Sequence, residues 1–176
     1  MRAAALIAAA LAVLGVGVVA CGGGSDADAC GLVSEEQAEE ILGTSVRAPE
    51  PDDESLGPER SCAWISRDST RDPEAAVYGF FVSERDDAGG RAEFDRRRDR
   101  PGRDFKSVPV DGLGDAAYFV EPADPDPATG TPSLPVLYVR DGDTVLLIGT
   151  FDSDDHPVDA PGARRMQRAA ARAALG

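Results

Sequence analysis

The sequence predicts an α+β fold, in which an antiparallel sheet of about five to six strands carries two to three helices and one disulfide. Segments rich in β-branched and aromatic residues, bounded by turn signals, indicate the strands, and segments with helix start and stop signals lie between them. The expected order is a helix, two strands, a helix, four strands and a last helix. This order favours an antiparallel sheet with helices packed on it.

The first helix is expected over residues 34–42. Ser34 and Gln37 have the spacing of a capping box, in which each side chain accepts a hydrogen bond from the other residue's backbone, and Gly43 supplies a helix stop. Residues 49–60 follow as a solvated loop, because three prolines and five acidic residues fall within them.

Six strands and two further helices account for most of the remaining chain. A charged helix is expected from about Ala88 to Arg100, ended by Pro101-Gly102. Asp141-Gly142 is a two-residue hairpin signal between the last two strands. Pro161 opens a final helix whose apolar face comprises Met166, Ala169, Ala170, Ala173 and Ala174. The strands are expected at 62–66, 75–83, 105–110, 116–121, 134–140 and 143–151.

The first twenty-one residues are typical of an export signal that ends in a lipid-modified cysteine. Arg2 is followed by an apolar run that ends at Val18-Val19-Ala20-Cys21, and Gly22-Gly23-Gly24 comes directly after it. We therefore expect a signal peptide over 1–20, acylation (palmitate) of Cys21, and a location on the extracytoplasmic side of the cell membrane. The alternative is that the run is a transmembrane helix, near the lower length limit for one.

Cysteine content agrees with an oxidising compartment. With Cys21 assigned to the anchor, Cys30 and Cys62 remain as an even pair, and neither has the spacing of a zinc or redox motif. We expect one disulfide between them. Trp64, on the same strand face as Cys62, is expected to pack against the bridge, with a ligand-stacking surface as the alternative.

Composition limits the function classes. The formal charge is −14, and about −15 once Arg2 has been removed with the signal, which disfavours nucleic acid as a partner. A single extracytoplasmic domain over 30–176, a flexible tether over 21–29 and a monomer are expected. Arginine greatly outnumbers lysine, whose one occurrence is Lys106, and this bias indicates a high-GC, actinobacterial-type source.

These features together resemble a known family. The features are a lipoprotein signal, Cys30 before a helix ending in Ile-Leu-Gly, the segment Ser61-Cys62-Ala63-Trp64 and the segment Gly112-Leu113-Gly114-Asp115-Ala116-Ala117. In these the chain is similar to a family of actinobacterial envelope lipoproteins catalogued as a domain of unknown function. The resemblance spans nearly the whole mature chain. It implies a Cys30–Cys62 bridge and a small α+β domain similar to PsbP-like domains and to the extracellular sensor domains of mycobacterial kinases. It implies no catalytic residues.

Three patterns that point to chemistry have simpler explanations. Gly112-x-Gly114 fits a nucleotide-binding turn only if a helix follows, whereas a strand is expected there. The segment Asp152 to His156, with Asp154 and Asp155, has oxygen ligands for a hard cation, but a solvated acidic loop is favoured and no metal or cofactor is expected. No spacing singles out a catalytic carboxylate pair among the 32 acidic residues.

Arginines concentrate in the second and third helices. Arg164, Arg168 and Arg172 recur every four residues along the last helix, which has no acidic residue, and Arg96 and Arg97 lie in the other. If both helices cover the same side of the sheet, they form a basic face for an anionic partner; the alternative is that the arginines are solvated and paired with acidic loops.

The sequence therefore favours a non-enzymatic, lipid-anchored envelope domain that acts as a binding or sensor-type module for a small hydrophobic or anionic ligand or for an envelope partner. An envelope hydrolase that works through acidic side chains and a purely structural envelope protein are the alternatives. A raised carboxyl pKa in a cleft would favour the hydrolase, and an apolar pocket or a charged face would favour the binding module.

Overall fold

The computed structural model describes residues 29–51, 60–67, 76–123, 134–152 and 157–176. The signal segment, Cys21 and the tether up to residue 28 lie outside them, as do Asp154, Asp155 and His156. The elements, in chain order, are a 3₁₀ turn Ala29–Gly31, α1 (Glu35–Leu42), β1 (Glu50–Pro51), β2 (Arg60–Arg67), β3 (Ala76–Arg85), α2 (Ala88–Asp99), β4 (Phe105–Val110), β5 (Ala116–Pro122), β6 (Val136–Asp141), β7 (Thr144–Asp152) and α3 (Ala160–Leu175).

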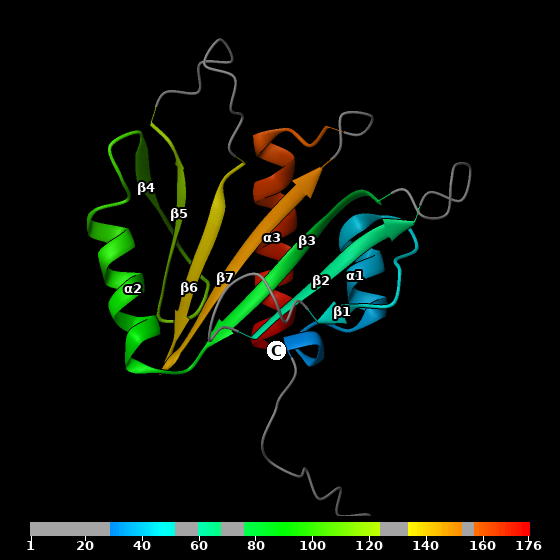
Figure 1. Ribbon diagram of the computed structural model, residues 1–176, viewed down its shortest axis with the longest axis horizontal. Helices are drawn as coiled ribbons and strands as arrows, with labels where there is room; N and C mark the ends of the chain where they lie inside the picture. Colours follow the sequence, from blue (N-terminus) through cyan, green and yellow to red (C-terminus); the bar gives the residue numbers. More distant parts are fainter. Residues whose placement is uncertain (1–28, 52–59, 68–75, 124–133, 153–156) are drawn as a thin grey trace, which may run out of the picture.

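The strands form one twisted sheet in the order β1-β2-β3-β7-β6-β5-β4, and every neighbouring pair is antiparallel (Figure 1). The predicted α+β class, the element order and the helix-carrying antiparallel sheet are confirmed. Six long strands match the prediction, and the additional β1 is a two-residue pairing, Glu50 with Ala63 and Pro51 with Cys62, inside the segment expected to be a loop.

Local sequence signals explain the helix ends. Ser34 accepts a hydrogen bond from the Gln37 backbone N–H at 3.2 Å, and the Gln37 side chain accepts one from the Ser34 N–H at 2.8 Å, so the predicted capping box is present. Gly43 ends α1 in a left-handed conformation, with φ of 70°. Asp87 caps α2 by accepting a hydrogen bond from the backbone N–H of Gly90, and Asp159 caps α3 by accepting one from the backbone N–H of Gly162.

Two turns show where local prediction was accurate and where it was one residue off. Gly112 and Gly114, both with positive φ, connect β4 to β5, so the glycine pair forms the expected strand-to-strand turn and no helix follows it. In the β6–β7 hairpin, Asp141 pairs with Thr144. The two loop residues are therefore Gly142 and Asp143, one position later than predicted, because Gly142 takes the first left-handed position, with φ of 57°.

The helices lie on both faces of the sheet. α1 and α3 contact each other and cover the face that carries Phe80, Val139 and Ile148. α2 covers the other face over β4 to β7, where Phe94 packs edge-on against Tyr118. The hypothesis that the second and third helices share one side of the sheet is therefore wrong. Local sequence does not specify to which face each helix-bearing connection crosses.

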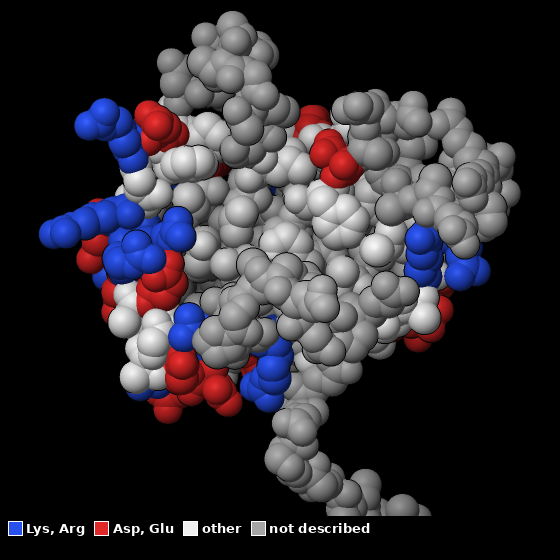
Figure 2. Space-filling model, in the orientation of Figure 1, with Lys and Arg blue, Asp and Glu red and all other residues white. Residues whose placement is uncertain are grey.

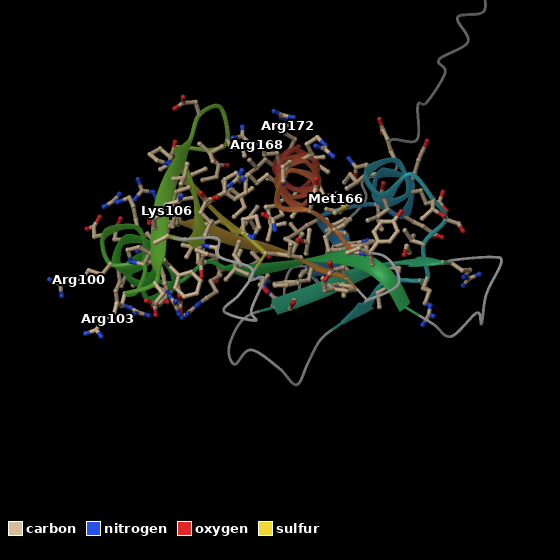
Figure 3. The ribbon with its side chains drawn as sticks, turned by 90° about the horizontal axis from the view of Figure 1, so that it is seen from above. Arg100, Arg103, Lys106, Met166, Arg168 and Arg172 are labelled. Carbon is tan, nitrogen blue, oxygen red and sulfur yellow. A yellow bond between two sulfur atoms is a disulfide. The ribbon has the colours of Figure 1, made fainter. Side chains whose placement is uncertain are left out.

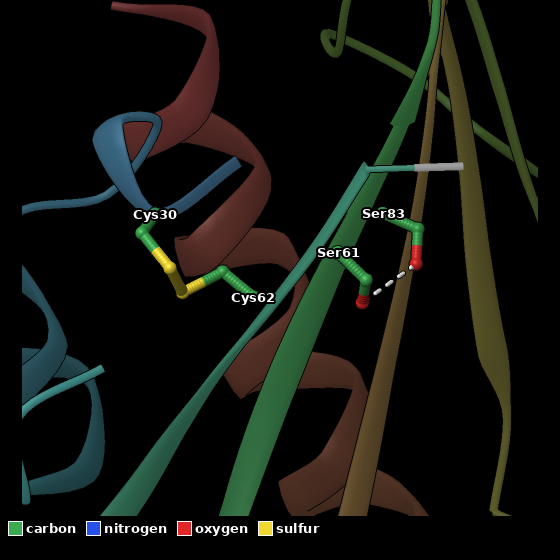
Figure 4. Close-up of a disulfide and its surroundings, with 4 residues drawn as sticks. All are labelled: Cys30, Ser61, Cys62 and Ser83. Atoms are coloured by element: carbon green, nitrogen blue, oxygen red, sulfur yellow. Dashed lines mark hydrogen bonds between the residues drawn. A yellow bond between two sulfur atoms is a disulfide. The ribbon is translucent and has the colours of Figure 1, made fainter. Parts of the chain in front are cut away.

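The predicted disulfide joins the 3₁₀ turn to β2 (Figure 4). The sulfurs of Cys30 and Cys62 are 1.99 Å apart, and the bond ties the start of the fold to the sheet. Trp64 is fully buried and stacks on Phe80 with ring centroids 5.1 Å apart. Trp64 is thus a core residue in the same cluster as Cys62, and its burial excludes the ligand-stacking alternative.

Candidate binding groove between α1 and α3

The predicted basic residues divide into different environments. On α3, the guanidinium of Arg164 is hydrogen-bonded to Glu121, whose side chain is only 8% exposed and also lies 3.4 Å from the Lys106 ammonium. Arg164 and Arg168 both lie over the Phe119 ring, at 6.0 and 5.5 Å from its centroid. These two arginines therefore cover a part of the sheet that α3 does not reach.

The two α2 arginines predicted to bind a partner are paired with an acid of the same helix. Arg96 and Arg97 both donate to the Glu93 carboxylate, the latter at 2.7 Å. Partial burial opposes ionisation of Glu93, but the hydrogen bonds from Arg96 and Arg97 outweigh it and hold the pKa of Glu93 below its ordinary value. Arg96 and Arg97 thus follow the alternative in which the arginines are paired, and their partners lie within the helix and not in acidic loops.

A groove of about 680 Å³ runs between α1 and α3, on the side of these helices that faces away from the sheet. Figure 3 shows the two helices side by side, with Met166 and Arg172 labelled on α3. The groove is lined by Gln37, Glu40 and Ile41 of α1 and by Gly162, Arg165, Met166, Ala169, Arg172 and Ala173 of α3.

The floor of the groove is apolar and made mostly of small side chains. On α3, Gly162, Met166, Ala169 and Ala173 follow one another at intervals of four, three and four residues. This spacing keeps side chains on one helix face, and it is the spacing that helices use when they pack along their length. Three of these four residues are Gly or Ala, so a bound backbone can approach α3 closely.

The two walls of the groove carry opposite charge. Arg165 and Arg172, seven residues apart, stand on the α3 wall, and within the described part of the chain neither has an ion pair. The α1 wall presents Glu40 and belongs to a helix with four glutamates and no basic residue. Of the sequence-predicted arginines, only Arg172 lies in this groove.

The buried side of α3 differs from its predicted apolar face. Ala163, Gln167, Ala170 and Ala171 are buried, whereas Met166 and Ala169 are only partly buried and line the groove. Gln167 is fully buried, and its amide donates hydrogen bonds to the Pro135 carbonyl and, at 3.2 Å, to the Thr150 hydroxyl. The buried face of α3 is therefore centred on Gln167, and part of the predicted apolar face forms the groove floor.

Sequence reasoning missed Arg165 and the α1 side of the site. The 4-3-4 spacing of Gly162, Met166, Ala169 and Ala173 was visible in the chain, but nothing in the sequence showed that α1 would lie beside α3. Only the tertiary contact turns two separate helix faces into one groove.

Three of the described carboxyl groups have a pKa that departs from its ordinary value. Asp87, Glu93 and Asp99 are the ones with a resolved shift, and in each the pKa is lowered. Asp152, from the candidate cation segment, accepts a hydrogen bond from the Val158 N–H at 2.7 Å, which caps the turn into α3. Its neighbours Asp154, Asp155 and His156 lie outside the described residues, and within those residues no cluster of three metal-ligating side chains occurs.

Comparison of the chain with protein-family models, with curated proteins and with solved structures gives no match. Among the residues that the structure describes, no helix is both long and apolar enough to cross a bilayer.

Proposed function

We propose that this protein is a lipid-anchored, non-catalytic docking module of the cell envelope that binds an amphipathic helix of an envelope partner in the α1–α3 groove. The observation that carries the proposal is the groove itself, with an apolar floor between a basic and an acidic wall. A helix that places an apolar stripe on Met166 and Ala169 has its acidic flank against Arg165 and Arg172 and its basic flank against α1. The opposite walls would fix its orientation.

The shape of the groove favours a helix over a small molecule. Small-ligand sites are cavities that enclose most of the ligand's surface. This groove is open to solvent, and a helix in a groove needs only one face covered.

The anchor is part of the proposal and has its own test. Acylation of Cys21 would hold the domain at the outer side of the cell membrane on its tether. We expect Cys21→Ala to release the protein from the membrane fraction. Retention of this variant after carbonate washing would contradict the lipid anchor without bearing on the groove.

The docking proposal is tested by photo-cross-linking in cells. A benzoylphenylalanine replaces Ala169 in the groove or, as the matched control, the exposed Ala92 of α2 on the opposite face. We expect a discrete protein adduct from position 169 alone, whose cross-linked peptide has an apolar stripe at helical spacing between an acidic and a basic flank. An adduct with a lipid, an adduct with a second copy of this chain, or equal labelling from both positions would overturn the proposal.

Charge reversal gives a second, independent measure. Arg165→Glu with Arg172→Glu is expected to reduce the adduct about tenfold, since each reversed rim pair costs roughly 0.5–1 kcal/mol. Arg100→Glu with Arg103→Glu makes the same change in net charge at exposed positions far from the groove, as Figure 3 shows, and should leave the adduct unchanged. An equal loss of adduct in the two double variants would mean that only the net charge of the protein matters.

A further inference from the structure

Three basic side chains from two separate elements gather on the flank of α3 that faces away from the α1–α3 groove. Arg164 and Arg168 belong to α3, and Lys106 belongs to β4, the last strand at one edge of the sheet. Figure 3 shows α3 between α1 on one side and β4 on the other, with Lys106 and Arg168 labelled. We call these three residues the β4–α3 basic site.

Two side chains of β5 hold the three cations close to one another. Arg164 and Lys106 both contact the carboxylate of Glu121. Arg164 and Arg168 both lie over the ring of Phe119, at 6.0 and 5.5 Å from its centroid. Glu121 and Phe119 are 7% and 1% exposed, so the cations rest on a buried base that restrains them before any ligand binds.

Positive charge is in excess at the β4–α3 basic site. Among the described residues, Glu121 is the one acidic side chain in ion-pair contact with any of the three cations. Figure 2 shows the opposite face of the sheet, where acidic side chains lie directly beside the basic ones of α2, as in the pair Arg98 and Asp95 at 3.2 Å. At the β4–α3 basic site one carboxylate faces three cations, so a surplus of two positive charges remains.

The excess charge is accessible to a ligand. The side chains of Lys106 and Arg164 are 49% and 39% exposed, and Arg168 is partly exposed. Arg164 donates to Glu121 from Nε and Nη2, which leaves the other N–H groups of its guanidinium for a ligand. Within the described part of the chain, the guanidinium of Arg168 lies over the Phe119 ring and has no ion pair or hydrogen bond. Donors from both the helix and the strand are therefore open on the same surface.

We propose that the β4–α3 basic site binds a phosphate monoester, carried by a lipid headgroup or by a soluble molecule. A phosphate monoester has a charge of about −1.5 to −2 at neutral pH and three acceptor oxygens. These match the surplus of two positive charges and the three donor side chains. The planar fork of arginine also fits phosphate oxygens in pairs.

A carboxylate ligand fits the site less well, because it has one charge and two oxygens. Glu121 shows how far such a group reaches: its oxygens engage Lys106 and Arg164, while Arg168 has no ion pair within the described residues. A ligand with a third oxygen can accept from all three side chains. The site lies on the other flank of α3 from the groove, so it is independent of the docking proposal.

The test is a titration of the full chain, purified in a nonionic detergent, with glycerol 3-phosphate and with acetate at equal ionic strength. Calorimetry gives the affinity, and the NMR signals of the arginine Nε–H groups, assigned with an Arg168→Gln variant, locate the bound ligand. We expect glycerol 3-phosphate to bind at millimolar concentration and acetate at least about tenfold more weakly. No saturable binding of glycerol 3-phosphate, or equal binding of acetate, would overturn the proposal.

Reconstitution in nanodiscs distinguishes the two sources of the phosphate. The full chain is held in discs of phosphatidylcholine alone or of phosphatidylcholine with phosphatidic acid. A change of the Arg168 signal in the phosphatidic acid discs assigns the phosphate to a lipid headgroup. Its absence there, with glycerol 3-phosphate bound in solution, assigns the site to a soluble ester. This second experiment alone depends on the Cys21 anchor, so failure of the anchor leaves the titration in solution as a test of the site.

Variants separate a built site from general charge attraction. Arg168→Gln and Lys106→Gln should each weaken binding of glycerol 3-phosphate about fivefold. Arg100→Gln makes the same change in charge at an exposed position away from the site, as Figure 3 shows, and should leave binding unchanged. Glu121→Gln should tighten binding several-fold, because it removes the one negative charge.

Thermal unfolding of each variant identifies a loss of binding that comes from misfolding. Unchanged affinity in both folded variants of Arg168 and Lys106, or an equal loss in Arg100→Gln, would refute the site.

Discussion

Removal of the Cys30–Cys62 bond should lower the stability of the domain by an amount that follows from the loop it closes. The two cysteines are separated by 32 residues. In the chain-entropy model, a loop of this length contributes about 3.7 kcal/mol by restricting the unfolded chain. For a domain of this size, roughly 2–4 °C of Tm corresponds to each kcal/mol, so the variant should unfold about 10 °C lower.

The assay is thermal unfolding by circular dichroism of the wild type, Cys30→Ala, Cys62→Ala and the double variant. Each of the three variants opens the same loop, so all three should unfold near the same temperature, with Cys62→Ala slightly lower because Cys62 is fully buried. Additive losses in the double variant, or a decrease of less than about 3 °C, would refute the argument that loop closure is the source of the stabilisation.

Three further changes test other parts of the fold. Gly112→Ala, at positive φ with open space around it, should lower the free energy of unfolding by about 1 kcal/mol. Gly114→Ala should lower it by at least about 2 kcal/mol more, because the new Cβ would overlap the Arg140 carbonyl. Urea unfolding compares the two variants. The hydrogen bond from the Gly90 N–H, and next the one from Arg85, lowers the pKa of Asp87. The ionised Asp87 therefore stabilises the folded domain above the pKa of the unfolded state, and this stabilisation is lost as the pH falls below about 4. Asp87→Asn should make the free energy of unfolding depend less on pH in that acid window. An unchanged pH dependence would exclude Asp87 as its source. Gln167→Met should destabilise the domain by about 1 kcal/mol in the same urea assay, since it removes one buried and one part-buried hydrogen bond and leaves the Pro135 carbonyl without this donor; a more stable variant would contradict this.

The features predicted correctly from the sequence depend on residues that are close together in the chain. The capping box at Ser34, the strand over 105–110 and the turn at Gly112 and Gly114 are set by local backbone chemistry. The disulfide followed from counting the cysteines that remained after Cys21. The hairpin at Gly142 was misplaced by one residue because Asp-Gly signals a turn without fixing which residue opens it.

The features that were not predicted depend on pairings between distant segments. The pairing of β3 with β7 places Phe81 beside Gly149 and Phe151 beside Gly79, and no local pattern in either strand indicates it. The α1–α3 groove requires two helices from opposite ends of the chain to meet. Arg164 and Arg168 were candidates for partner binding, and nothing in the sequence indicated that both would lie over the ring of Phe119.

The strand order divides the chain into two halves that meet along one ladder. β1 to β3 come from the first half, β4 to β7 form a meander in the second, and only the β3–β7 ladder joins them within the sheet, with α3 crossing behind it. The disulfide lies entirely in the first half, so its formation requires no residue of the meander. The bond can therefore close before the meander is in place, and because β3 and β7 are far apart in the chain, we expect docking of the meander along β3 to be the slow step of folding.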